Sequence, residues 1–173
     1  LGTKLSITSR KAQTTRYQLL GIHTTPETQY IFVDTPGYQL KHLNTLNKNL
    51  NKTVKHALQE VDVILFLIEP RQMTDVDKKI LQMIPEDTPI ILVINKVDRL
   101  KEKTKILELI NVFKENSRYK EIIPTSVKKG NNLNELLECA RNFLPEQEFI
   151  YEETDGFVKP NKLYSIYYTL GKD

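Results

Sequence analysis

The chain has 173 residues, 39% of them hydrophobic and 27% charged, which is the composition of one soluble globular domain with a short appendage. Lysine and arginine exceed aspartate and glutamate by only 25 to 22, so the charge permits an anionic partner, either a phosphate ligand or a nucleic acid, without requiring one. The sequence has no histidine or cysteine pair at zinc-ligand spacing and no secretory signal. Its apolar runs fall well short of the roughly 18 residues that a membrane span needs. We therefore expect a cytosolic protein or one attached only peripherally to a membrane.

The first predicted elements form a β-hairpin. Two strand-like apolar runs between Tyr17 and Val33 flank a Thr-Pro-Glu-Thr turn, which is typical of two antiparallel strands. Apolar residues then recur every three or four positions from Leu43 to Val61, and this period predicts a long amphipathic helix that ends near Glu60.

Strands and helices alternate strictly along the next part of the chain. The expected strands are VILFLI, IILVI and EIIPTS, and the expected helices lie around DVDKKILQMI, over 102–116 and over 132–143. Short all-apolar strands separated by amphipathic helices predict an α/β domain with a mostly parallel, doubly wound sheet covered by helices on both faces. We expect residues 1–146 to form this domain, and we assign residues 147–173, which show no clear period, to a tail.

The polar loops DTPG, EPRQ, NKVD and TSVKKG follow the carboxyl ends of the predicted strands, where ligands bind in doubly wound sheets. The segment Asp34-Thr35-Pro36-Gly37 follows one such strand directly. A carboxylate at a strand tip can hold Mg²⁺ through water, and a glycine lets its N–H approach a phosphate closely. The same tetrapeptide is equally typical of an ordinary turn, so both interpretations stay open.

The segment Asn95-Lys96-Val97-Asp98 ends a buried strand with polar side chains and predicts a guanine site. The two oxygens of Asp98 match the adjacent N1–H and N2–H₂ donors of guanine, whereas adenine presents an acceptor at N1. We expect Asn95 to contact another edge of the base and tie neighbouring loops together, the Lys96 stem to lie along the ring, and Val97 to turn into the core. The alternative is a solvated strand end.

A third polar loop, TSVKKG from Thr125 to Gly130, follows the next predicted strand. We expect the N–H groups of Val127 and Lys128 to donate to a base carbonyl such as guanine O6. Ser126 would fix the turn and Gly130 would allow its exit, although a plain strand-to-helix loop has a similar sequence.

The polar, basic segment SRKAQTTRYQ precedes the hairpin. A threonine hydroxyl there could ligate Mg²⁺ when a γ-phosphate is present and release it afterwards, which would make the segment an ordered-to-disordered switch. The alternative is a solvated basic loop.

The order Asp-x-x-Gly, Asn-Lys-x-Asp and Ser-x-x-x-Gly, each at a predicted strand end, resembles the P-loop GTPase superfamily with its Ras-like G domain. The segments KLSITSRKAQTTR, GIHT and VDTPG resemble the Era family of bacterial GTPases, over residues 2–146. The resemblance implies an enzyme that binds GTP and GDP with Mg²⁺, hydrolyses GTP, binds small-subunit rRNA and acts as a switch in assembly of the 30S ribosomal subunit. It also implies a cytoplasmic monomer with peripheral contact to the inner membrane.

The same resemblance assigns roles to individual residues. Thr15 would be the switch threonine on Mg²⁺, with Thr14 as an adjacent candidate; Asp34 would be the water-mediated Mg²⁺ carboxylate, and Gly37 would sense the γ-phosphate. The expected catalytic residues are Thr15, Gly37 and Tyr38, and the expected GTP-binding residues are Asp34, Thr35, Pro36, Gly37, Tyr38, Asn95, Lys96, Val97, Asp98, Ser126, Val127 and Lys128.

Tyr38 stands where the GTPase template has a glutamine that orients the attacking water. Its phenol is a poor general base at neutral pH, so we expect slow intrinsic hydrolysis, with water placed by backbone groups, Mg²⁺ and a monovalent cation or a partner.

The sequence departs from the family in lacking a Gly-x-x-x-x-Gly-Lys-Ser/Thr loop, which the family places immediately before Leu1, after a strand in the middle of the sheet. Without that strand the sheet would have a central gap and unpaired backbone groups, so we expect the chain to be part of a longer polypeptide. The tail lacks the Gly-x-x-Gly signature of the family's KH domain, and we expect it to be a linker with fragments of such a domain. The second hypothesis is a non-hydrolysing G-domain scaffold that binds RNA or protein.

Overall fold

The computed structural model describes residues 19–34, 58, 61–102, 104–148 and 166–169. The elements in chain order are β1 (Leu19–Thr24), β2 (Gln29–Asp34), β3 (Ile64–Ile68), α2 (Asp75–Met83), β4 (Ile90–Ile94), the short 3-10 helix η1 (Val97–Arg99), α3 (Thr104–Lys114), β5 (Tyr119–Pro124), α4 (Leu133–Arg141) and β6 (Ile166–Thr169). The predicted helix from Leu43 to Glu60 lies outside the described residues, except for the buried Leu58. No helix in the described ranges is long and apolar enough to cross a membrane.

The predicted β-hairpin is confirmed. Strands β1 and β2 pair in antiparallel register from Leu19 opposite Asp34 to Thr24 opposite Gln29. The turn between them is closed by Thr25, whose N–H donates to the carbonyl of Thr28 at 2.8 Å. The Thr25 hydroxyl also donates to this carbonyl and accepts from the Thr28 N–H, each at 3.0 Å. The Thr25 hydroxyl thus gives the Thr28 N–H, which the turn leaves without a backbone acceptor, a hydrogen-bond partner.

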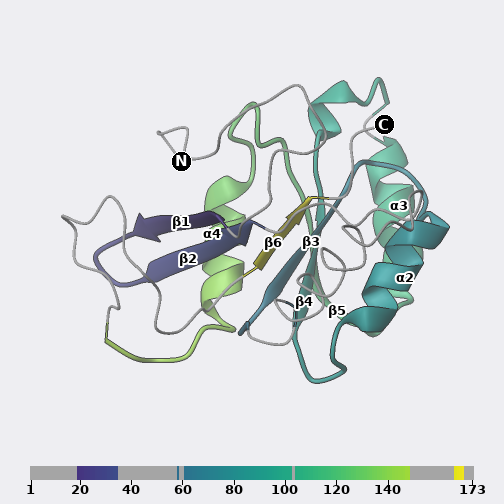
Figure 1. Cartoon of the computed structure of the whole chain (residues 1–173). Helices are drawn as coiled ribbons and strands as arrows, with labels where there is room; N and C mark the ends of the chain where they lie inside the picture. The colour runs from purple at the N-terminus through teal and green to yellow at the C-terminus, as the bar shows by residue number, and fades with distance from the viewer. Residues whose placement is uncertain (1–18, 35–57, 59–60, 103, 149–165, 170–173) are drawn as a thin grey trace.

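The sheet has the strand order β1-β2-β6-β3-β4-β5, and every pairing except β1 with β2 is parallel (Figure 1). Every residue of β3 and of β4 is buried, as expected of strands covered on both faces. The predicted mostly parallel α/β sheet is therefore confirmed. Strand β5 begins at Tyr119, two residues before the predicted start at Glu121.

The middle of the sheet contains β6, which comes from the segment that the sequence places in the tail. Residue Ile166 pairs with Val33 of β2 and with Ile64 of β3, and the pairing with β3 continues to Thr169 opposite Leu67. Instead of the expected central gap, the described residues therefore have a four-residue strand between β2 and β3. Its sequence, Ile-Tyr-Tyr-Thr, is rich in β-branched and aromatic residues that favour a strand, but four residues are too few to show a period.

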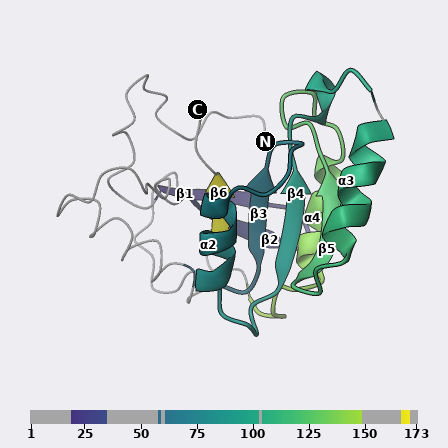
Figure 2. The same ribbon diagram turned by 90° about the vertical axis from the view of Figure 1, so that its right-hand side faces the viewer.

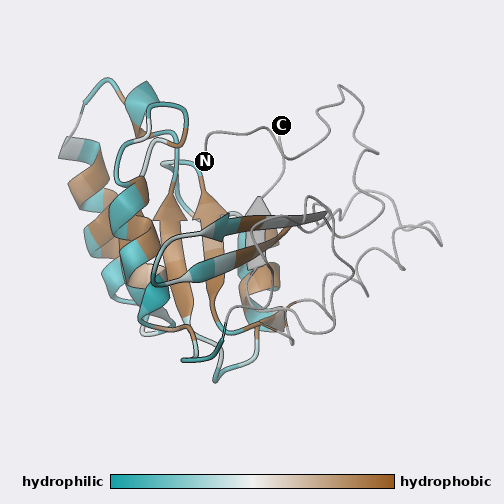
Figure 3. Cartoon of the chain, turned by 90° about the vertical axis from the view of Figure 1, so that its left-hand side faces the viewer, coloured by the Kyte–Doolittle hydropathy of each residue, from teal (hydrophilic) through white to brown (hydrophobic). Residues whose placement is uncertain are grey.

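Alternate residues of the central strands face two separate hydrophobic cores. One core contains Ile64, Phe66 and Ile68 of β3 and is covered by α2 and α3. The other contains Val63, Leu65 and Leu67 and is covered by α4 through Leu136 and Ala140. Figure 2 shows α2 in front of the sheet with α4 behind it, and Figure 3 shows the apolar colouring of the strands between the helices. The sheet is therefore covered on both faces, as predicted.

Thr125, directly after β5, provides a test of core packing. The residue is fully buried, and its hydroxyl oxygen has no hydrogen-bond partner among the described residues. We expect Thr125→Val, which keeps the shape and removes the unsatisfied hydroxyl, to stabilise the fold by about 1 kcal/mol in chemical denaturation. The control Thr125→Ala also removes the methyl group and should lose stability. Destabilisation of equal size in both variants would contradict this account.

Asp62 precedes β3 at the amino edge of the sheet, in the wall of a cavity of about 480 Å³ that Glu27, Arg141 and Glu146 also line. Burial raises the pKa of Asp62 from 3.8 to about 6, and its Oδ2 atom has no partner among the described residues. Between these two pKa values the folded state binds more protons than the unfolded state, so the contribution of Asp62 to stability falls as pH rises.

We expect Asp62→Asn to raise the thermal unfolding midpoint at pH 7 to 8, where the buried carboxylate is charged. The gain should shrink as pH falls through about 6 and should be lost near pH 4, where Asp62 is protonated in the folded state. Thermal melts of both proteins from pH 4 to pH 8 would check this. A gain that does not depend on pH would assign the effect to something other than the charge.

Candidate functional site

Polar loops that follow β3, β4 and β5 meet at the carboxyl edge of the sheet, because these strands are parallel. Three backbone hydrogen bonds join the loops. The Asn95 N–H donates to the carbonyl of Ile68 at 2.8 Å, the Thr125 N–H to Ile94 at 2.8 Å, and the Val97 N–H to Thr125 at 3.2 Å. Backbone hydrogen bonds therefore join the loops that carry the predicted guanine site.

Asn95 ties the loop after β4 to the loop after β5, as predicted. Its side-chain carbonyl Oδ1 accepts hydrogen bonds from the N–H of Lys96 at 2.8 Å and from the N–H of Val127 at 3.1 Å. One amide oxygen thus satisfies two backbone donors from different loops. The Nδ2 group has no partner among the described residues and can donate to a base.

Asp98 presents an exposed carboxylate that is held by the neighbouring loop. The Ser126 hydroxyl donates to Asp98 Oδ1 at 2.5 Å. This hydrogen bond lowers the pKa of Asp98; desolvation opposes it, and the positive charges of Lys129 and Arg99 add to the lowering. The group is therefore a carboxylate at neutral pH, and because each oxygen has two lone pairs, it can still accept two donors from a base. The sequence placed Ser126 in the turn and among the expected GTP-binding residues but did not predict this contact with Asp98.

Lys96 and Val97 point in different directions from the same loop. Val97 packs against the core on the α2 and α3 side, which confirms that it turns inward. Lys96 has left-handed backbone geometry, with φ of +64°, and its ammonium pairs with the carboxylate of Glu69. Glu69 begins the polar loop EPRQ after β3, which the sequence places at the ligand edge, but no individual role was predicted for Glu69.

The TSVKKG loop forms a tight turn, with one difference from the prediction. Ser126 accepts from the N–H of Lys129 and pairs with Asn131 on the far side of the turn. Gly130 has φ of +73°, a conformation that favours glycine. The N–H of Val127, however, is already donated to Asn95 and is not free for a base carbonyl. Among the described residues, the N–H of Lys128 has no partner and is the remaining backbone donor of the predicted pair.

The phosphate side of the predicted site lies mostly outside the described residues. Thr15, Thr35, Pro36, Gly37 and Tyr38 all fall there, so their assigned roles stay predictions. Asp34 is the last residue of β2 and pairs with Tyr167 of β6, which puts its backbone near the carboxyl edge that also carries Asn95. The structure therefore brings together the base side of the predicted site and the tip of β2.

Comparisons with known proteins agree with this geometry. A sequence model of the family described as "50S ribosome-binding GTPase" matches residues 1–96. The GTPase Era of Chromobacterium violaceum is 42% identical over 153 residues, covering 88% of this chain and 52% of that protein. The GTPase Era of Coxiella burnetii is also 42% identical, over 152 residues, covering 87% of this chain and 51% of that protein. The chain thus spans about half the length of these relatives.

Two solved structures have the same fold. A variant of Aquifex aeolicus Era bound to GDP and AlF4⁻ matches with a TM-score of 0.82 and 38% identity, over 92% of this chain and 55% of that one. Era in complex with MgGDPNP and nucleotides 1506–1542 of 16S ribosomal RNA matches with a TM-score of 0.81 and 38% identity, over 90% and 53%. Because the family model matches more than half of its length, the chain belongs to the 50S ribosome-binding GTPase family, and two relatives named GTPase Era are each 42% identical to it.

Proposed function

We propose that the carboxyl edge of the sheet binds the guanine base of GTP and GDP, and that the protein hydrolyses GTP. The observation that carries the proposal is the exposed, charged carboxylate of Asp98, which Ser126 holds at 2.5 Å beside the loop that Asn95 ties in place. A carboxylate fixed in this way accepts the paired donors of guanine and meets an acceptor on adenine. The similarity to Era bound to GDP and AlF4⁻ supports the same assignment.

Magnesium is part of this proposal. Carboxylate and hydroxyl oxygens are the donors that Mg²⁺ prefers, and the predicted pair of Asp34 and Thr15 supplies one of each. The position of Asp34 at the tip of β2 is suitable for this role, and the similar Era structure contains MgGDPNP. When bound, Mg²⁺ would neutralise charge on the transferring phosphate.

We further propose that the complete polypeptide binds small-subunit rRNA and acts as a slow GTPase switch in 30S assembly, as a cytoplasmic monomer with peripheral membrane contact. The similarity to Era in complex with nucleotides of 16S ribosomal RNA supports the rRNA-binding part of this proposal. Binding to that RNA should weaken steeply as salt rises, because counterions are released when phosphates are neutralised. An affinity that does not change with salt would count against rRNA binding.

Phosphate release separates the two candidate functions. The complete polypeptide should release phosphate from GTP in a Mg²⁺-dependent reaction and should leave ATP intact. Binding of rRNA without nucleotide binding or phosphate release would instead favour the alternative, a non-hydrolysing scaffold that keeps the sheet and its loops.

A further inference from the structure

Glu69 joins the loop after β3 to the loop that carries the predicted base contacts. It is the first residue after β3, and its Oε1 atom pairs with the ammonium of Lys96, 27 positions further along the chain. The two side chains are partly exposed, with relative accessibilities of 51% for Glu69 and 36% for Lys96. The contact is therefore at the surface of the carboxyl edge, beside Asn95.

The backbone around Lys96 is fixed relative to Glu69. The N–H of Asn95 donates to the carbonyl of Ile68, the residue before Glu69, at 2.8 Å. The next residue, Lys96, has a left-handed φ of +64°, which residues other than glycine rarely adopt. The backbone positions of Glu69 and Lys96 are therefore fixed relative to each other. What remains variable is the direction of the Lys96 side chain, which is set by the group that its ammonium contacts.

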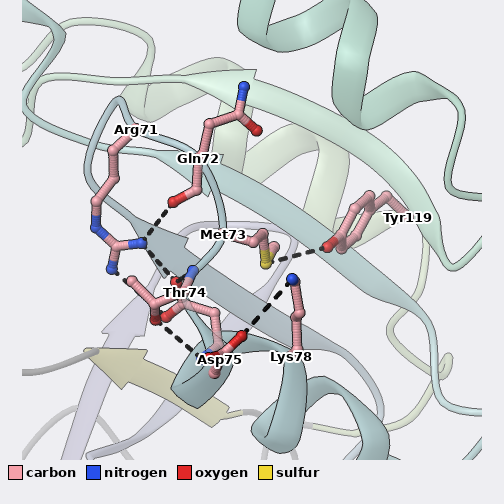
Figure 4. Close-up of polar contacts among 8 residues, drawn as sticks. Arg71, Gln72, Met73, Thr74, Asp75, Lys78 and Tyr119 are labelled. Atoms are coloured by element: carbon pink, nitrogen blue, oxygen red, sulfur yellow. Dashed lines mark hydrogen bonds and ion pairs between the residues drawn. The ribbon is translucent and has the colours of Figure 1, made fainter.

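Glu69 begins a loop whose hydrogen bonds centre on the buried carboxylate of Asp77. Figure 4 shows Arg71, Gln72 and Thr74 of this loop together. The Arg71 guanidinium donates to Asp77 Oδ2 at 2.5 Å and to the carbonyl of Gln72 at 2.9 Å, while the Arg71 N–H donates to the Glu69 carbonyl at 2.7 Å. Asp77 also accepts from the N–H of Thr74 at 2.7 Å, which completes the capping box of α2. Helix α2 thus anchors the loop that carries Glu69.

The charges around Glu69 keep it ionised. The hydrogen bond from Lys96 is the largest cause that lowers its pKa; slight desolvation opposes this, and the positive charges of Lys96, Arg99 and Arg71 add to the lowering. Glu69 is therefore a carboxylate at neutral pH. A pair this exposed adds little to stability, so its value for the fold alone is small.

We propose that Glu69 is a positioning residue of the guanine site, which holds the Lys96 ammonium so that the aliphatic stem of Lys96 is presented to the face of the base. The inference rests on the proposed function and extends it to a residue on the neighbouring loop. A free lysine side chain loses rotamer entropy when it is ordered, and a stem that Glu69 has already ordered avoids part of that cost on binding.

The test uses Glu69→Gln, and Glu102→Gln is its matched control. Glu102 is exposed and pairs with Lys105 at 3.4 Å, so the control makes the same chemical change at a similar surface ion pair. We expect Glu69→Gln to weaken GDP binding about three- to tenfold and Glu102→Gln to leave it unchanged. The preference for GDP over the xanthine analogue XDP should not change, because Glu69 acts on the ring face rather than on the donors that Asp98 reads.

Testing Glu69→Gln again in a Lys96→Met protein separates a positioning role of Glu69 from a general structural effect. Lys96→Met keeps an apolar stem and removes the ammonium, so adding Glu69→Gln to it should cause no further loss of GDP affinity. Equal GDP affinity of wild type and Glu69→Gln, or the same loss in both Lys96 backgrounds, would overturn the positioning role. Failure of the wild-type protein to bind GDP at all would instead overturn the proposed function, and with it this inference.

Discussion

Asp98→Asn is expected to weaken GDP and GTP binding roughly 100-fold or more and to make xanthine nucleotides the better ligands. The substitution turns one carboxylate oxygen into an NH₂ donor, which faces the donors of guanine but matches the carbonyl that xanthine carries at that position. The remaining amide oxygen can still accept from Ser126, so the loop contact at 2.5 Å keeps an acceptor. Competition of GDP against XDP in the complete polypeptide measures the change.

Asp87→Asn is a matched control for this exchange. Asp87 is exposed in the loop between α2 and β4, at the opposite edge of the sheet, and the substitution removes the same charge. It should leave both affinities unchanged. Equal GDP affinity in wild type and Asp98→Asn would remove Asp98 from the base site.

Asn95→Ala is expected to reduce both stability and nucleotide affinity, because two backbone N–H groups lose one acceptor. Lys96 and Val127 donate to Asn95 Oδ1 at 2.8 Å and 3.1 Å, and their loops carry the lysine stem and the serine that holds Asp98. Since water can reach these groups in part, the loss of stability should be about 1–2 kcal/mol in chemical denaturation. GDP affinity should fall about tenfold or more, because the loops lose their common anchor.

Asn95→Asp separates the two roles of this side chain. The carboxylate keeps an acceptor for both N–H groups, so stability should stay close to that of wild type, but the NH₂ donor is lost and GDP affinity should still fall. Equal loss of stability in the alanine and aspartate variants would show that Asn95 does not act as the acceptor that ties the loops.

The sequence predicted the sheet and its helices well because their signals are local and strong. Strands β3 and β4 are continuous apolar runs, and α2, α3 and α4 each carry an apolar face with the helical period. Because strands and helices alternate along the chain, the strands were predicted to be parallel. Parallel strands end at the same edge of the sheet, so the meeting point of the polar loops was predicted as well. The position of Asn95 and the inward turn of Val97 followed from the same pattern.

The features that the sequence did not predict depend on contacts between distant segments. Strand β6 is four residues long and gains its place only by pairing with β2 and β3. The pairing of Glu69 with Lys96 joins residues 27 positions apart, and no spacing rule connects them. The use of the Val127 N–H by Asn95 depends on how two loops approach each other. Such contacts follow from tertiary structure, which local pattern does not encode.

The most direct test of the central claim is a calorimetric titration of the complete polypeptide with GDP and, in parallel, with ADP in the presence of Mg²⁺. If the loop after β4 reads guanine through Asp98, GDP should bind saturably at one site and ADP should bind at least 100-fold more weakly or not at all. Equal affinity for GDP and ADP, or no binding of either, would contradict the assignment of this edge as a guanine site.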